Sequence, residues 1–215
     1  MRQIYEKCHE YNIDLHNIFI DFSQAFDTVK RDVIYNSLIK RNVPDKLIKL
    51  IKLTMQWNKM KVKVNCSYSE WFEMKTGVRR RSYIRLLFSV VLDSVITNLE
   101  VWGNKTTRLK QICAYGDDIV IIGRTKHILI DTFCKLKHEA LNAGLIVNNN
   151  KTKYLHCSRK PIQPTYTEEQ FEQINSFKWL GAMVNTDSCI EEEIKERIAA
   201  GNRPYHVHKS YLHQN

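Results

Sequence analysis

The chain has 215 residues, of which 43% are hydrophobic and 26% are charged, so it can form one domain core with at most a small appendage. Its 33 Lys and Arg residues outnumber 23 acidic residues, and the formal net charge of +10 favours a polyanionic partner. The 6 Cys residues include no Cys-x-x-Cys pair, and no apolar run could span a bilayer. These features exclude a disulfide framework, a zinc site of that type and a membrane protein. We therefore expect an intracellular protein, nuclear or cytoplasmic.

Apolar periodicity and breaker residues predict alternating helices and short strands in the first half of the chain. Pro44 separates two of the helices, because the residue before a proline is disfavoured in the helical conformation. In chain order we expect a helix ending near residue 11, a strand over 17–22, helices over 30–41 and 45–55, a strand pair over 61–64 and 71–76, and a helix over 85–98.

The second half continues the pattern with two hairpins. Gly144 follows a helical run and is suited to be its C-terminal cap. In chain order we expect a hairpin over 112–122, a helix over 126–143, strands over 145–147 and 154–157, a loop over 161–167, a hairpin over 176–185 and a helix over 190–200. Helices packed on one face of an antiparallel sheet would make an α+β domain.

Two adjacent acids stand at the bend of the first of these hairpins. Asp117 and Asp118 lie between apolar segments, with Gly116 at the turn. Like charges side by side cost Coulomb energy unless a cation neutralises them, and Mg²⁺ prefers carboxylate oxygens. The hairpin alone leaves an alternative, since Asp-Asp is also ordinary in a solvent-exposed turn.

A third acid lies far upstream, inside an apolar and β-prone run. Asp21 occupies the middle of the segment over 18–22, where burial is expensive unless the acid is paired or binds a metal. If this strand lies beside the hairpin, Asp21, Asp117 and Asp118 converge on one sheet edge. That arrangement is the protein's share of a two-metal site for phosphoryl transfer.

Several segments resemble, in the same order, motifs of the reverse transcriptases of non-LTR (LINE-type) retrotransposons. One is the Ala-Tyr-Gly-Asp-Asp stretch, which resembles the family's Tyr-Ala-Asp-Asp box with Gly116 where alanine is usual. The matching segments are the first palm motif and its helix (19–51), the acidic box (114–123), the next palm motif (144–155), the primer-grip hairpin (177–184) and the start of the segment toward the thumb (193–205).

The resemblance implies a polymerase palm-like antiparallel sheet with helices packed on one face. Residues 1–160 would form the reverse-transcriptase palm, and residues 161–215 the primer-grip hairpin and the start of the thumb connection. The fingers would be largely missing and the thumb truncated. We therefore expect a fragment of a longer polyprotein, whose fingers, thumb and endonuclease regions are not in this chain.

The resemblance also implies roles for individual residues. Asp21 and Asp117 would bind two Mg²⁺ ions, or Mn²⁺, with Asp118 beside them. Phe26 would exclude a 2′-hydroxyl and so select deoxynucleotides, and Lys151 would lie near the triphosphate. The primer end would be held by Phe177, Trp179, Leu180 and Gly181. Without the resemblance, the two aromatic residues Phe26 and Trp179 are equally well read as core packing and Lys151 as a surface lysine.

The implied function is RNA-directed DNA polymerase, transferring nucleotides from dNTP to the 3′-hydroxyl of a DNA primer on an RNA template. Two alternatives stay open. Gly-Asp-Asp is also the signature of RNA-directed RNA polymerases, although the Ala-Phe-Asp run at 25–27 argues against them. The chain could also be a non-catalytic, nucleic-acid-binding remnant.

One segment departs from the family pattern. The family has Gln-Gly-Asp-Pro-x-Ser-x between Gly-Val-Arg and Leu-Leu-Phe, whereas this chain has the six residues Arg80–Arg85, three of them arginine. One reading is a new basic patch for phosphates. We favour a short frameshift: deleting two nucleotides and then one from codons for Gln-Gly-Asp-Pro-Ile-Ser-Ala-Leu yields Arg-Arg-Ser-Tyr-Ile-Arg-Leu. We therefore expect impaired activity.

Aromatic and basic residues are interleaved over 57–63 and 68–75. This pattern is typical of nucleic-acid surfaces that combine stacking with charge. The alternative is that the lysines over 40–63 form only a basic face in water.

Overall fold

The computed structural model describes residues 2–56, 59–73, 84–99, 110–159, 171–186 and 194–202. Its first elements are α1 (Arg2–Glu10), β1 (Leu15–Ile20), β2 (Phe22–Ser23), α2 (Ala25–Thr28), α3 (Arg31–Lys40), α4 (Asp45–Gln56), β3 (Lys59–Met60), β4 (Lys63–Val64), β5 (Ser67–Tyr68), β6 (Phe72–Glu73) and α5 (Ile84–Asn98). There follow β7 (Lys110–Tyr115), β8 (Asp118–Gly123), α6 (Lys126–Asn142), β9 (Ile146–Val147), β10 (Lys153–Cys157), β11 (Glu172–Gln173), β12 (Ser176–Trp179), β13 (Ala182–Asn185) and a helix over 194–202.

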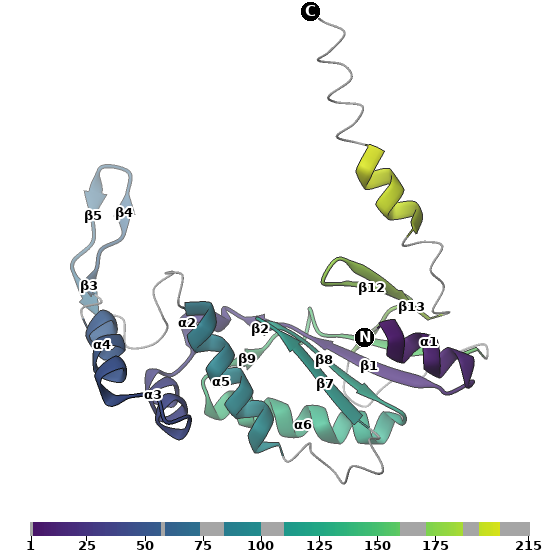
Figure 1. The fold of residues 1–215 in the computed structure, drawn as a ribbon. Helices are drawn as coiled ribbons and strands as arrows, with labels where there is room; N and C mark the ends of the chain where they lie inside the picture. Colours follow the sequence, from purple (N-terminus) through teal and green to yellow (C-terminus); the bar gives the residue numbers. More distant parts are fainter. Residues whose placement is uncertain are drawn as a thin grey trace, which may run out of the picture.

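The centre of the fold is a five-stranded sheet in the order β11-β10-β1-β8-β7. β1 pairs antiparallel with both β10 and β8, β8 pairs antiparallel with β7, and only β11 runs parallel to its neighbour. In Figure 1, α5 and α6 lie on one side of this sheet, and α1 and the β12–β13 hairpin lie on the other. The predicted α+β palm-like architecture, with its main helices on one face, is confirmed.

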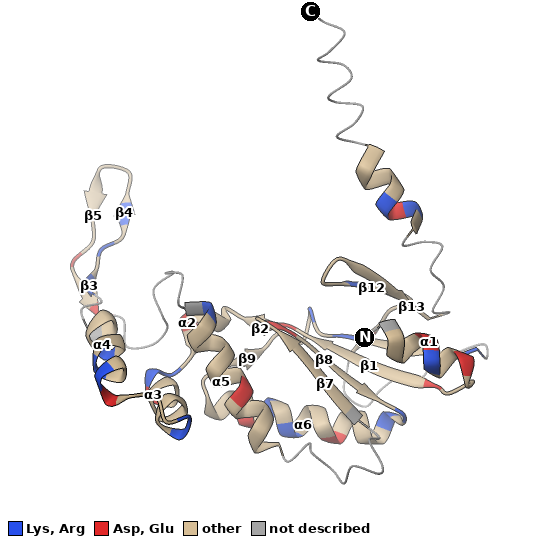
Figure 2. Cartoon of the chain, in the orientation of Figure 1, with Lys and Arg blue, Asp and Glu red and all other residues tan. Residues whose placement is uncertain are grey.

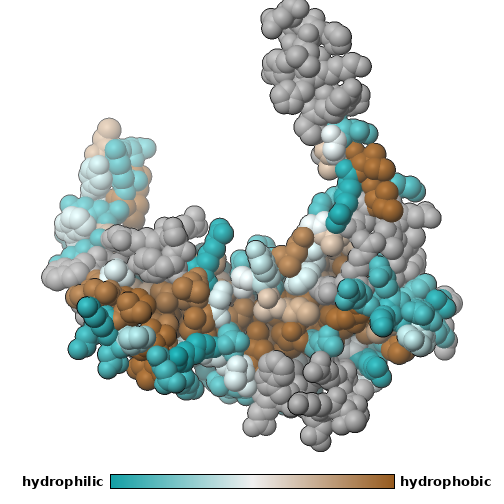
Figure 3. Space-filling view, in the orientation of Figure 1, coloured by the Kyte–Doolittle hydropathy of each residue, from teal (hydrophilic) through white to brown (hydrophobic). Residues whose placement is uncertain are grey.

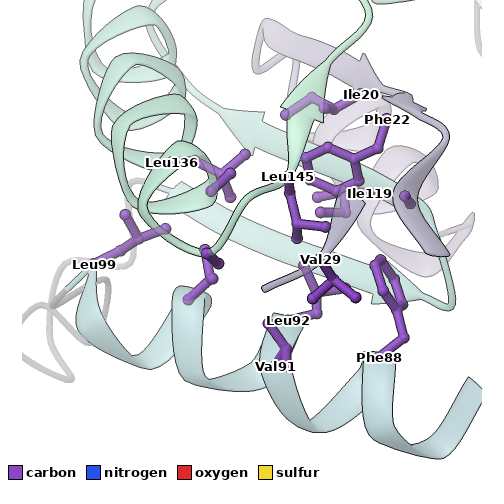
Figure 4. Packing of buried hydrophobic residues seen from close by; sticks show 14 of the residues in the cluster. Ile20, Phe22, Val29, Phe88, Val91, Leu92, Leu99, Ile119, Leu136 and Leu145 are labelled. Atoms are coloured by element: carbon purple, nitrogen blue, oxygen red, sulfur yellow. The ribbon is translucent and has the colours of Figure 1, made fainter. Parts of the chain in front are cut away.

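The alternation of side chains along β1 explains why both faces of the sheet are covered. Ile18 and Ile20 belong to the core cluster that also contains residues of α5 and α6, shown in Figure 4. Leu15 and Phe19 point the other way and pack in a second cluster with Tyr5 of α1. Successive side chains of a strand point to opposite faces, so a strand covered on both faces is largely apolar along its whole length. The continuous apolar run of β8 has this cause.

The helices and the acidic hairpin agree with the sequence-based expectations, but one strand pairing was wrong. Residues 61–64 do not pair with 71–73: β4 pairs with β5, and β3 pairs with β6. The turn between β4 and β5 begins at Asn65, whose φ of 53° suits asparagine better than most residues. The expected loop over 161–167, residues 74–76, and residues 190–193 of the expected last helix lie outside the described residues. Among the described helices, none is both long and apolar enough to cross a membrane.

The end of α6 depends on a glycine, as predicted. Gly144 has a φ of +85°, and an added Cβ would lie 2.7 Å from the Thr28 carbonyl oxygen. The left-handed conformation alone costs an L-residue about 1–2 kcal/mol. We therefore expect Gly144→Ala to lower the free energy of unfolding by more than about 2 kcal/mol, measured by urea denaturation.

The matched control for this substitution is Gly123→Ala in β8. A Cβ at Gly123 would meet its nearest atom, Leu129 Cδ1, at 3.5 Å, which is ordinary van der Waals contact. Equal destabilisation by the two substitutions would contradict the role given to the Gly144 backbone.

Candidate active site

The two adjacent acids lie at the end of the sheet, on a tight hairpin. Tyr115 of β7 faces Asp118 of β8, so Gly116 and Asp117 form a two-residue turn. Gly116 has a φ of 62°, and nothing lies within 4 Å of the position of its missing Cβ. Glycine is therefore favoured at this turn by its backbone conformation and not by lack of space.

Asp21 lies directly across from this hairpin. The ladder between β1 and β8 ends with the pair Ile20 and Ile119, so the next residue of each strand, Asp21 and Asp118, stand opposite one another. Alternation places both acids on the face that also carries Phe19. Figure 2 shows acidic segments in red at this end of the sheet. The convergence expected from the sequence is present for these two acids.

The acids repel one another, and one carboxylate oxygen accepts no hydrogen bond among the described residues. The pKa of the Asp118 carboxyl is raised, first by desolvation and then by the negative charges of Asp117 and Asp21. Asp21 Oδ2 is buried and accepts no hydrogen bond among the described residues. A buried carboxylate oxygen without a donor is costly unless a cation approaches it.

One cation is already near. Lys151 Nζ lies 3.7 Å from Asp21 Oδ2, beyond hydrogen-bond distance. The backbone fixes this neighbourhood, because Asn148 N donates to the Asp21 carbonyl oxygen at 2.8 Å and Lys151 N donates to the Asn148 carbonyl oxygen at 3.2 Å. Since the Lys151 side chain is 70% exposed, it screens the acid only in part.

A pocket of about 340 Å³ opens beside the acids. One part of its wall is polar and the other is aromatic. Its lining residues are Phe19, Ile20, Asp21, Asp118, Ile119, Asn150, Lys151, Lys153, Phe177 and Trp179. The aromatic wall is held to β1 by Phe19, whose ring stacks on that of Phe177 with centroids 4.1 Å apart.

The structure brings five of the predicted site residues together in this pocket: Asp21, Asp118, Lys151, Phe177 and Trp179. The others lie elsewhere. Asp117 is at the adjacent turn, and Leu180 and Gly181 form the tip of the β12–β13 hairpin. Phe26 is half-buried in α2, and its ring packs against that of Phe88 with centroids 5.0 Å apart. In this structure Phe26 therefore has the packing role that was its alternative.

Sequence reasoning did not assign the other five lining residues to the site: Phe19, Ile20, Ile119, Asn150 and Lys153. Phe19 could have been found from strand alternation, since it is two residues before Asp21 on the same face. Lys153 lies opposite Phe19 in the ladder between β1 and β10, and that register is not readable from the sequence. Its ammonium donates to the Asn150 carbonyl oxygen at 2.8 Å and pairs with Glu172.

The donor set fits a divalent cation that is completed by substrate. Among the described residues, no three Asp, Glu, His or Cys side chains already gather as ligands of one ion. Mg²⁺ is commonly bound by one or two carboxylates together with substrate phosphates and water, and not by an all-protein cage. Asp21, whose Oδ2 accepts no hydrogen bond among the described residues, and Asp118, whose pKa is raised, provide two such carboxylates.

The repulsion predicts how stability responds to charge and metal. Because the folded-state pKa of Asp118 is raised, its ionisation opposes folding, and this destabilisation grows as pH rises through that pKa. In EDTA at pH 7, Asp118→Asn should therefore melt at a higher temperature than the unaltered chain, by differential scanning calorimetry. Added Mg²⁺ should raise the Tm of the unaltered chain more than that of the variant. A lower Tm for the variant in EDTA would contradict the repulsion, and Asp131→Asn on α6 is the control.

Comparisons with known proteins give a consistent picture. The family model described as "Reverse transcriptase (RNA-dependent DNA polymerase)" matches residues 2–184. The chain is 23% identical to the "Retrovirus-related Pol polyprotein from type-1 retrotransposable element R2" of Nasonia vitripennis, and the match covers 84% of this chain and 19% of that protein. The chain therefore spans about a fifth of that relative.

Solved structures of telomerase resemble the fold. Apo telomerase from Candida tropicalis superposes with a TM-score of 0.64 at 15% identity, covering 87% of this chain and 34% of that one. Telomerase from Candida albicans in complex with a fragment of telomeric RNA gives a TM-score of 0.61 at 13% identity, covering 86% of this chain and 33% of that one. At such identities the likeness concerns the fold.

Proposed function

The chain belongs to the reverse transcriptase family, and from this premise we propose that it is the palm region of a retrotransposon RNA-directed DNA polymerase. The observation that carries the proposal is the meeting of Asp21 with the Asp117–Asp118 turn at one end of the sheet, beside Lys151. Acids from two distant segments, placed on one face next to a basic side chain, suit transfer of a nucleotide from a triphosphate.

We propose that Asp21, Asp117 and Asp118 hold two Mg²⁺ ions, for which Mn²⁺ can substitute. When bound, such ions lower the pKa of the primer 3′-hydroxyl and stabilise the leaving pyrophosphate. The carboxylates position the reacting oxygens and become less repulsive as charge is compensated. Lys151, tied through Asn148 to the backbone of Asp21, supplies positive charge where the pyrophosphate leaves.

The pocket supplies the positions for primer and dNTP in this proposal. Phe177 and Trp179, which line the pocket, provide aromatic surfaces against the primer end. Phe26 is the residue proposed to exclude a 2′-hydroxyl. Its contact with Phe88 would then fix the position of the ring below the sugar.

We propose an RNA template and a DNA primer as partners, and a longer polyprotein as the context of this chain. Residues 1–160 form the palm in this proposal, and residues 161–215 the primer-grip hairpin and the start of the thumb connection. The separate two-stranded sheet of β12 and β13, seated on β1 through Phe177, supports that division of roles.

The tip of the β12–β13 hairpin allows stability and primer binding to be separated. Leu180 and Gly181 have φ values of 49° and 82°, a type I′ turn in which leucine is strained and asparagine favoured. We expect Leu180→Asn to raise the free energy of unfolding by about 1 kcal/mol while raising the KM for primer-template and leaving the KM for dNTP unchanged. Primer binding unaltered by this substitution would contradict a role of the tip in holding primer.

The proposed function is tested by single-nucleotide incorporation on a primed RNA template with Mg²⁺. We expect incorporation of dNTP above that of rNTP, since a site shaped against a hydroxyl discriminates by about 10²-fold. A preference for rNTP would instead indicate an RNA-directed RNA polymerase. If no nucleotide is incorporated with Mg²⁺ or with Mn²⁺, even after the family sequence is restored at residues 80–85, the chain is a non-catalytic remnant that binds nucleic acid.

A further inference from the structure

A hairpin between α4 and α5 carries basic and aromatic side chains away from the active site. It consists of β3 to β6, residues 59–73, and Figure 1 shows it projecting from the end of α4, well away from the central sheet. We call it the arm. Two of its lysines lie over aromatic rings: Lys61 Nζ is 4.5 Å from the centroid of Trp71, and Lys63 Nζ is 5.6 Å from that of Tyr68.

The arm places these two rings on the same face only because its strands are unequal. Met60 pairs with Phe72, and Lys63 pairs with Tyr68. Between these pairs one strand has two residues and the other has three, so the second strand carries a bulge. Residues three apart in a regular strand point to opposite faces, and one extra residue brings them back to the same face. Tyr68 and Trp71 thereby share the face of Lys61 and Lys63.

Both aromatic rings on this face of the arm are accessible to a ligand. Trp71 and Tyr68 are 64% and 63% exposed, although large aromatic side chains are usually well buried. Each ring has a lysine against it and is held across the strands, so the four side chains form a ladder of alternating charge and π surface. Figure 2 shows lysines in blue on β3 and β4, and Figure 3 shows hydrophilic and hydrophobic side chains together on the arm.

We propose that this face of the arm binds single-stranded nucleic acid, the rings stacking on bases and the lysines contacting phosphates. The proposal rests on the proposed polymerase function, which requires a single-stranded template. Exposed aromatic rings interleaved with cations bind single strands with little sequence preference, because every base has a π face. The net charge of +10 favours a nucleic acid, which is a long polyanion, over a short acidic peptide as the partner.

A duplex fits this face less well. Its bases are stacked on one another, so it offers phosphates to lysines but no base to Trp71 and Tyr68. The contribution of the two rings to binding affinity therefore distinguishes stacking from attraction of phosphates alone. We expect this contribution to be large for a single strand and absent for a duplex.

The test uses the full chain and fluorescence anisotropy with labelled oligouridylate, oligothymidylate and a blunt duplex. Stacking contributes about 1–3 kcal/mol per base, and 1.4 kcal/mol is tenfold in affinity. We expect Trp71→Ala to weaken single-strand binding about tenfold or more and Trp71→Phe to retain most of it. The double variant Y68A/W71A should lose about 10²-fold. Binding of duplex should be unchanged in all three variants.

The lysines have a separate signature. Each phosphate contact to a single strand contributes about 0.7 to the slope of log affinity against log salt. K61A/K63A should lower that slope by about 1.4, while Y68A/W71A should leave it unchanged. The control is K135A/K137A, which removes the same charge from α6, where Lys137 lies over the ring of Phe133.

Single-strand affinity that is the same in Y68A/W71A and the unaltered chain, with unchanged circular dichroism, would overturn the proposal. So would an unaltered chain that binds no single strand. Preference for oligouridylate over oligothymidylate, or the reverse, identifies which strand the arm holds. If the unaltered chain incorporates no nucleotide but Y68A/W71A still weakens single-strand binding, the polymerase function fails and the proposal for the arm stands. The two failures are therefore distinguishable.

Discussion

Replacing Asp117 with asparagine is expected to reduce dNTP incorporation by more than about 10²-fold. Removing a partner that only orients a metal ligand costs about 10–100-fold, and loss of a carboxylate ligand itself should exceed this. The carboxylate at the turn also adds negative charge beside Asp118. Its loss therefore removes both a ligand of the cation and part of the negative charge that attracts it. The measurement is the single-turnover rate with Mg²⁺ on a primed RNA template.

The control for this substitution is Asp131→Asn. Asp131 is an exposed acid of α6 that pairs with Lys135 at 2.8 Å, so its neutralisation changes net charge equally without touching the sheet end. If D117N and D131N incorporate nucleotide at the same rate, the acidic turn has no part in the chemistry.

The second large effect is expected from restoring the altered segment. Replacing Arg80–Arg85 by Gln-Gly-Asp-Pro-Ile-Ser-Ala returns the family sequence and the lost residue. Residues 80–83 lie outside the described residues, and the segment ends at the beginning of α5, whose Phe88 contacts Phe26. Since a displacement of about 1 Å in substrate positioning can cost about 10²-fold, we expect a gain of that order in incorporation rate.

A version with Ala-Ala in place of Gln-Gly is the matched control for this replacement, because it restores the length and the other family residues without the Gln-Gly pair. A gain with both versions would assign the defect to the length or to the Asp-Pro-Ile-Ser-Ala part of the segment, and a gain with neither would place it elsewhere. The gene's nucleotide sequence tests the origin of the segment independently: a window without out-of-frame similarity to the family codons would exclude the frameshift.

The acidic site was predictable because its signals are local or periodic. Gly116 before two acids, between apolar strands, defines the turn, and Asp21 in an apolar run demands compensation. Their meeting followed from the resemblance and not from either segment alone. The β1–β8 register that sets Asp21 opposite Asp118 is a long-range pairing, which no local pattern contains.

The features that were missed depend on such long-range or irregular geometry. Lys153 enters the pocket through the register of β10 against β1, and Phe19 through stacking with a hairpin far along the chain. The arm's pairing was wrong because a tight turn beginning at Asn65 pairs β4 directly with β5, so that Phe72 pairs with Met60 and not with a residue of 61–64. Phe26 was assigned from its motif, and its contact with Phe88 became visible only from the packing of α2 on α5.

The most direct test of the central claim, that Asp21, Asp117 and Asp118 together bind the two divalent cations, is Mn²⁺ binding followed by electron paramagnetic resonance. It reads the site without requiring turnover. For the unaltered chain we expect saturable binding that Mg²⁺ displaces, with affinity reduced at least about tenfold in Asp21→Asn and in Asp117→Asn. Mn²⁺ affinity that is unchanged in both variants, relative to the unaltered chain and to Asp131→Asn, would contradict the claim.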